Sequence, residues 1–223
     1  MPKKRKTLPK NFKELIEAKD IERLKAVYDN CEIDAYNYGF DRSTALHSFG
    51  IPDELVRWLV EQGADINFRN HSQQTPLHSQ ASYRISNVAV FLELGADITA
   101  QDCYKYTPLH SAAGCSHIDA VKELIAHKAD IHAVDDRGHT PLGHALAYCG
   151  NIDIVRTVEV AEILLYAGAK ITSDMAISVE RIGMRFERYR ADYNKDHLKE
   201  TDEGLMNLYT MFSVAPVPKI QTR

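Results

Sequence analysis

The stretch "TPLHSAAGCSHIDAVKELIAHKADIHAVDDRGHTPL", residues 107–142, begins and ends with the same three letters. The tetrapeptide Thr-Pro-Leu-His also stands at 75–78, and the variant Thr-Ala-Leu-His stands at 44–47. The threonines at 44, 75, 107 and 140 are therefore spaced by 31, 32 and 33 residues. A nearly fixed period of this size indicates a chain built from repeated supersecondary units.

The residue types within one period predict a helix, a turn, a second helix and an extended connector. Thr107 is suited to cap a helix, and Pro108 fits the first helical position, where no amide partner is lost. Apolar residues spaced by three and four predict a second helix over 118–127. Glycine accepts the left-handed conformation that ends such a helix, and it stands at the corresponding position in three units, as Gly63, Gly95 and Gly168.

With these residues the chain resembles ankyrin-repeat proteins, whose unit of about 33 residues carries the pattern T-P-L-H-x-A. The resemblance implies an all-α solenoid with hairpin-like connectors over residues 11–171. It divides into a divergent N-terminal cap at about 11–37 and four repeats at about 38–69, 70–101, 102–134 and 135–171. It also implies that three histidines bridge backbone groups of neighbouring units, namely His47, His78 and His110.

Two units depart from the pattern. Lys128 replaces the glycine that ends the third unit, which should cost about 1 kcal/mol if the left-handed turn is kept. In the fourth unit Gly143 stands where the family has histidine and His144 follows it, so we expect this unit to lack the bridge. The distance from Thr140 to Gly168 is 28 residues, against 21 in the third unit, which predicts about two extra helical turns and a protruding fourth unit.

Two apolar stripes follow the repeats, and we expect a helix pair at 172–213. The first stripe is Met175, Val179, Ile182, Phe186, Tyr189 and Tyr193, and the second is Leu205, Leu208 and Phe212. A pair that caps the last repeat is the favoured interpretation, and a separate partner-binding helix is the alternative. The pair is similar to the tail of some bacterial ankyrin proteins, which favours a bacterial origin. Pro216 and Pro218 predict an extended tail at 214–223.

The N-terminal segment is basic and the rest of the chain is acidic. Residues 1–10 hold five bases and no acid, whereas the remainder holds 22 bases and 31 acids. We expect residues 1–10 to be a disordered tail. Its "PKKRK" at 2–6 matches a nuclear localisation motif, with a solvated tail as the competing interpretation. The acidic remainder disfavours nucleic acid as a partner.

The sequence offers no pattern for catalysis or cofactor binding. The four cysteines form no CxxC pair, and the histidine pairs 127/132 and 139/144 lack further ligands at metal-site spacing. Phosphate-binding loops, nucleophile elbows and zinc-protease motifs are missing. We therefore expect no enzyme, no catalytic residue, no metal and no cofactor. No apolar run is long enough to cross a bilayer, so we expect a cytoplasmic protein, or a nuclear one only if "PKKRK" acts in a eukaryotic cell. We also expect a monomer.

The function that remains is protein binding. In a repeat solenoid the variable connector tips and first helices form a concave surface that suits a protein partner. Aligning the connectors predicts a partner-binding surface formed by Tyr38, Phe40, Arg69, His71, Gln74, Tyr104, Tyr106, Arg137 and His139. The competing interpretation is that these positions are simply exposed and variable. Alternatives to an interaction module are an inhibitor or immunity protein that occludes a toxin or enzyme, an effector acting in a host cell, and an enzyme.

Overall fold

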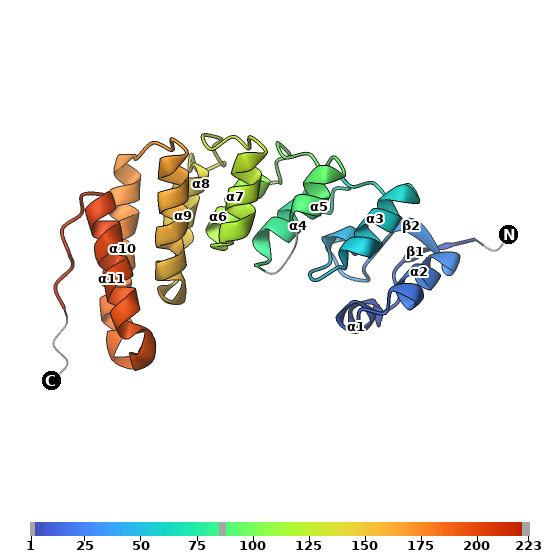
Figure 1. Ribbon diagram of the computed structural model, residues 1–223, viewed down its shortest axis with the longest axis horizontal. Helices are drawn as coiled ribbons and strands as arrows, with labels where there is room; N and C mark the ends of the chain where they lie inside the picture. Colours follow the sequence, from blue (N-terminus) through green and yellow to red (C-terminus); the bar gives the residue numbers. More distant parts are fainter. Residues whose placement is uncertain (1–2, 85–87, 220–223) are drawn as a thin grey trace.

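The computed structural model describes residues 3–84 and 88–219, which form an elongated, curved array with its two ends far apart (Figure 1). Its elements are β1 (Arg5–Thr7), α1 (Phe12–Glu17), α2 (Ile21–Asn30), β2 (Cys31–Tyr36), η1 (Ala45–His47), α3 (Asp53–Glu61), α4 (Pro76–Ser82), α5 (Val88–Glu93), α6 (Pro108–Gly114), α7 (Ile118–Ala126), α8 (Pro141–Tyr148), η2 (Asn151–Asp153), α9 (Ile154–Tyr166), α10 (Ser173–Tyr189), η3 (Arg190–Asp192) and α11 (Lys195–Met211). The predicted all-α repeat solenoid is confirmed.

The helices form two layers that run the length of the array. The first-helix layer consists of η1, α4, α6, α8 and α10, in which each element packs against the next. The second-helix layer consists of α2, α3, α5, α7, α9 and α11 in the same way. A continuous core lies between the layers and contains fully buried leucines from successive units, such as Leu55, Leu77, Leu109, Leu124 and Leu142. Because each unit buries its apolar face against its neighbours, the array depends on contacts between repeats.

The repeated histidine is a structural element, as predicted. In the third unit the backbone amide of Thr107 donates to His110 Nδ1 at 3.2 Å. That bond leaves Nε2 as the protonated ring nitrogen, and Nε2 donates to the carbonyl oxygen of His139 in the next connector at 3.0 Å. His47 and His78 make the same bridge, to the carbonyls of Gln74 and Tyr106. Burial lowers the pKa of His110, which favours the neutral ring that this geometry requires.

The two departures from the pattern have clear structural outcomes. Lys128 adopts the left-handed conformation with φ 66°, in the place where Gly95 has φ 86° and Gly168 has φ 102°. Gly143 has no side chain to form the histidine bridge, and Met175 of α10 packs against this position. Helix α9 has 13 residues and α7 has 9, so the fourth unit gains about one turn rather than two. Most of the remaining insertion forms the η2 turn, and α9 extends beyond α7 (Figure 1).

The N-terminal segment differs from the expected disordered tail. The described residues 3–10 include β1, which pairs in parallel with β2. Leu8 is buried, and its amide donates to the carbonyl oxygen of Tyr36 at 2.8 Å. The Lys4 ammonium donates to the carbonyl oxygen of Tyr28 at 2.6 Å. A short strand at a sheet edge can keep its basic side chains in solvent while its backbone pairs, so the charge pattern did not reveal it.

The first repeat also differs from the others. Its first helix is only the single turn η1, whereas α4 and α6 have seven residues each. Gly50 follows closely with φ 73°, and Pro52 removes an amide donor two residues later. Both residues oppose continuation of a helix, because glycine favours the turn and proline restricts the residue before it.

The C-terminal helices extend both layers. Helix α10 packs against α8, and α11 packs against α9. Met175, Val179, Ile182 and Phe186 of the first stripe are buried, but Tyr189 is 51% exposed because α10 ends there. The Arg190 guanidinium links α10 to α11 by binding the carboxylates of Glu187 and Asp202. The expected extended tail has no regular structure at 214–219, and its residues 220–223 lie outside the described part.

Candidate protein-binding surface

Three of the four connectors end in a tight turn that the side chain of Asn70, Asp102 or Asp135 holds closed. Asp102 Oδ1 accepts hydrogen bonds from the amides of Tyr104 at 2.8 Å and Tyr106 at 2.9 Å. Asp135 Oδ1 does the same for the amides of Arg137 and His139. A carboxylate that satisfies two backbone donors fixes the turn, because leaving either donor unpaired would cost free energy. The tips are therefore shaped by local bonds.

Successive tips are also bonded to one another. The amide of His71 donates to the carbonyl oxygen of Asp41 at 2.9 Å, and that of Cys103 donates to the carbonyl oxygen of Ser72 at 3.0 Å. The amide of Asp136 continues the series to the carbonyl oxygen of Tyr104 at 3.0 Å. We call the connector segments 37–43, 69–74, 101–106 and 134–139 the tip surface. These bonds make it one continuous ribbon rather than four separate loops.

The predicted surface residues fall into two groups. Tyr38, Phe40 and Tyr104 project into solvent, with exposed fractions of 77%, 101% and 54%. Polar members have structural partners. The guanidinium of Arg69 donates to the carbonyl oxygen of Gln101 at 2.7 Å, and the ring of His71 contacts the carbonyl of Phe40. The side-chain amide of Gln74 donates through Nε2 to Asp102 Oδ2 at 3.2 Å. Arg69, His71 and Gln74 therefore help to join neighbouring tips.

Tyr106, unlike Tyr104, is half-buried. Its ring lies 5.7 Å from that of Tyr104, but also 4.4 Å from that of His144. Its hydroxyl lies 3.4 Å from the hydroxyl of Tyr148. Burial raises the pKa of the Tyr106 phenol. Tyr104 is thus a free contact residue, whereas Tyr106 belongs to a packed cluster beneath it.

Sequence reasoning missed two aromatic residues of the first-helix layer. Tyr148 at the end of α8 is 45% exposed, and its hydroxyl accepts a hydrogen bond from Arg137 Nη1 at 2.6 Å. Tyr83 directly follows α4 and stacks on Phe49 with ring centroids 4.6 Å apart. Both tyrosines stand eight positions after the capping threonine of their repeat. Aligning the repeats at that offset would have found them.

A buried polar group lies behind the fourth tip. Asp135 Oδ2 is 3.4 Å from His139 Nδ1 and 3.5 Å from His144 Nδ1. Burial opposes ionisation of Asp135, but hydrogen bonds from the amides of His139 and Arg137 hold the pKa of its carboxyl below the ordinary value. Burial and the neighbouring His110 lower the pKa of His144 to about 4, so its ring is neutral at physiological pH. The group therefore packs without a charged imidazole at position 144.

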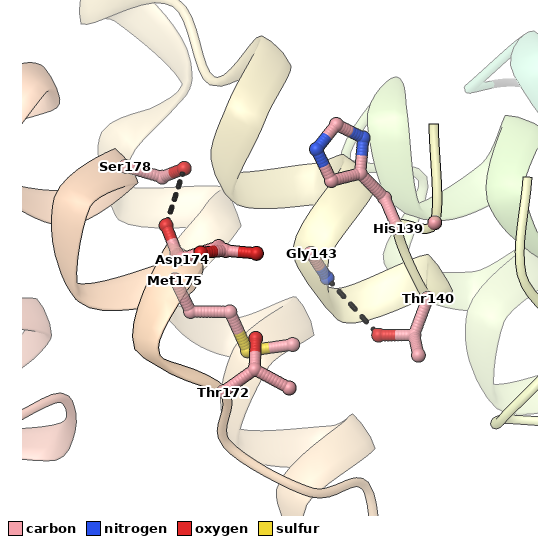
Figure 2. Close-up of a pocket in the computed structure, with 8 residues that line it drawn as sticks. His139, Thr140, Gly143, Thr172, Asp174, Met175 and Ser178 are labelled. Atoms are coloured by element: carbon pink, nitrogen blue, oxygen red, sulfur yellow. Dashed lines mark hydrogen bonds between the residues drawn. The ribbon is translucent and has the colours of Figure 1, made fainter. Parts of the chain in front are cut away.

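Two hollows separate the fourth repeat from α10. The smaller one lies between Gly143 and Met175, and Figure 2 shows His139 and Thr140 on one side with Asp174 and Ser178 on the other. The larger is a groove of about 320 Å³ that shares part of this lining. We call it the α8–α10 groove, and it is lined by Arg137, His139, Ala147, Tyr148, Asp174, Ile177, Ser178 and Arg181.

In the described part of the chain, potential metal ligands do not cluster in threes, and two of the thiols have raised pKa values. Within residues 3–84 and 88–219, no group of three potential ligands among His, Cys, Asp and Glu is placed to hold a metal ion. Burial raises the pKa of Cys149 to about 11 and also raises that of Cys115, so these thiols stay protonated and are poor nucleophiles. No helix of the described segments has the length and hydropathy to cross a membrane.

Comparison with known families agrees with the fold. A family model described as ankyrin repeats (3 copies) matches residues 10–102 and 86–174. These matches cover most of the chain, which therefore belongs to the ankyrin-repeat family. Ankyrin repeats are generally protein–protein interaction modules and typically have no catalytic activity. A search of curated proteins gave no match to this sequence.

Proposed function

We propose that this chain is a non-catalytic module that binds a partner protein through its tip surface and first-helix layer. The observation that carries the proposal is the continuous bonded ribbon of tips bearing the exposed rings of Tyr38, Phe40 and Tyr104. Tyrosine and phenylalanine supply large contact areas at little entropic cost, and a rigid ribbon loses little freedom on binding. Tyr148 and the Phe49–Tyr83 stack extend the aromatic character onto the first-helix layer.

The test compares an exposed tyrosine of the tip surface with an exposed tyrosine of the second-helix layer. Tyr104 lies on the tip surface, and Tyr166, at the end of α9 in the second-helix layer, is 98% exposed. The full-length protein is used to isolate a stoichiometric partner from its native cells, and the affinity of that partner for purified variants is then measured. We expect Tyr104→Ala to weaken binding by about thirtyfold, as for an interface residue worth about 2 kcal/mol. Tyr166→Ala should bind like the parent.

Each other outcome has a distinct meaning. If Tyr166→Ala weakens binding and Tyr104→Ala does not, the partner binds the second-helix layer and the proposed surface is wrong. If no partner is isolated and the protein converts a substrate alone, the binding function itself is wrong. An inhibitor or immunity role would require that the isolated partner is an enzyme or toxin whose activity falls when this protein is added.

A further inference from the structure

Exposed charge on the tip surface is mainly positive, although the chain as a whole is acidic. Its exposed charged residues are one acid, Asp136, and four bases, Arg42, Arg69, Lys105 and Arg137. The other acids of the tips are withdrawn from solvent. Asp102 and Asp135 are buried and accept backbone hydrogen bonds, and Asp41 is half-buried and accepts from Asn70 at 2.8 Å.

The second-helix layer has the opposite charge. In α3, α5, α7 and α9 the exposed bases are Arg57, Lys122 and Arg156, and the exposed acids are Asp53, Glu54, Glu61, Glu93, Asp119, Glu159 and Glu162. The tip surface and these second-layer helices therefore present charges of different sign to solvent. Because exposed charges within about 8 Å interact at physiological salt, an acidic partner segment is attracted to the tips and repelled by the second-helix layer.

Two arginines without carboxylate partners line the α8–α10 groove. They are Arg137 from the fourth tip and Arg181 from α10. Neither arginine forms an ion pair with a carboxylate in the described part of the chain. The arginines that do are Arg23, Arg57, Arg84 and Arg190. Unpaired guanidinium groups from two different elements at one groove provide donors that a carboxylate can accept.

Arg137 is held in position before any ligand arrives. One of its five N–H donors is used by the hydroxyl of Tyr148 at 2.6 Å, and that hydroxyl lies 3.4 Å from the hydroxyl of Tyr106. The remaining donors are available to a ligand. A guanidinium that is already oriented loses less side-chain entropy on binding than a free one.

The rest of the groove favours a single carboxylate on a peptide. Ala147, Ile177 and the ring of Tyr148 provide an apolar wall for the methylene groups of an acidic side chain. Asp174 also lines the groove, and its carboxylate disfavours a ligand with dense negative charge such as a nucleic acid. We propose that the α8–α10 groove binds an Asp or Glu side chain of an acidic partner segment, with Arg137 and Arg181 as its ligands. This inference rests on the proposed protein-binding function.

The experiment uses the full-length protein and a random dodecapeptide library displayed on phage. Peptides selected on the parent are synthesised, and their affinities are measured for Arg137→Gln/Arg181→Gln and for the matched control Lys122→Gln/Arg156→Gln. The control removes two exposed positive charges from the second-helix layer. We expect selected peptides rich in Asp and Glu, with affinity at least about tenfold lower for the first variant and nearly unchanged for the control. Replacing the acidic residue of the peptide by Gln or Asn should cause the same loss.

Two results would overturn the inference, and they can be told apart. Selected peptides that bind Arg137→Gln/Arg181→Gln as tightly as the parent would show that the groove takes no carboxylate, while protein binding would stand. If no peptide is enriched above a surface without protein, both the acidic specificity and the proposed binding of peptide segments are contradicted. Thermal melts of the variants within a few degrees of the parent would confirm that lost affinity does not come from unfolding.

Discussion

The ring of His144 occupies the space directly over Gly114. A Cβ atom added at Gly114 would lie 2.6 Å from His144 Cδ2 and 2.7 Å from its Nε2. The two residues belong to the first helices of neighbouring repeats, α8 and α6. The fourth repeat therefore lacks the bridging histidine but inserts the next residue into its neighbour, and this contact requires a glycine.

We expect Gly114→Ala to destabilise the protein by about 1–3 kcal/mol, the usual cost of overpacking a filled core. Alanine stabilises a helix by about 1 kcal/mol relative to glycine, so helix propensity alone would make Gly114→Ala stabilising. A loss of stability would show that the clash with His144 outweighs that gain. The measurement is urea unfolding of the parent, Gly114→Ala, His144→Ala and the double variant. If Gly114→Ala lowers the free energy of unfolding as much in the His144→Ala background as in the parent, the contact with His144 is not the cause of the destabilisation.

At Lys128 the opposite substitution should be tolerated. Its φ of 66° is in the left-handed region, so Lys128→Gly removes backbone strain while adding entropy to the unfolded chain. We expect a stability between unchanged and about 1 kcal/mol higher. Lys122→Gly, inside α7 and also exposed, is the matched control and should cost about 1 kcal/mol. A clear loss at 128 in thermal or urea unfolding would contradict this account of the turn.

Acid should destabilise the protein as the pH falls from about 6.5 to 4. The pKa of His144 is lowered to about 4 by burial and by His110, with Asp135 opposing the shift. The unfolded chain therefore binds a proton at His144 near pH 6.5 before the folded chain does, and stability falls with decreasing pH through this window. The penalty from His144 is at most about 3 kcal/mol.

The measurement is the free energy of unfolding between pH 7 and 4. His144→Gln should show a shallower decline than the parent, whatever its stability at pH 7. His132→Gln, which changes an exposed histidine, should retain the parent's decline. Equal declines in all three proteins would exclude His144 as a source of the acid sensitivity. Burial also lowers the pKa of His47, His78, His110 and His117, so part of the decline remains in every variant.

Removing the C-terminal helices should expose the apolar ends of both layers. Residues 1–172 lack α10 and α11, whose buried Val179, Phe186 and Leu208 cover α8 and α9. Each large apolar side chain contributes about 1.5–3 kcal/mol when fully buried. We expect the truncated protein to aggregate or to lose cooperative unfolding in light scattering and circular dichroism melts. A monomer with the melting curve of the parent would show that the repeats need no such cover.

The parts of the fold that local sequence determines were predictable, and the parts that depend on distant contacts were not. Thr107 and Pro108 act within one helical turn, so their pattern predicted the helix caps. The bridge from His110 to the carbonyl oxygen of His139 reaches the next repeat, and only the resemblance to ankyrin repeats implied it. The strand β1 depends on pairing with residues more than twenty positions away, and nothing in its basic letters indicated that pairing. The same reason explains Tyr106, because His144 and Tyr148, which partly cover it, come from the next repeat.

Amide hydrogen exchange of the protein with and without its isolated partner tests the central claim most directly. The account predicts slower exchange on binding in the tips at 101–106 and 134–139 and in α8, with little change in α7 and α9 of the second-helix layer. The amides of residues 102–106 already donate to acceptors within the protein, so added protection there would report the partner covering the tips. Protection confined to α7 and α9, with unchanged exchange at the tips, would contradict it.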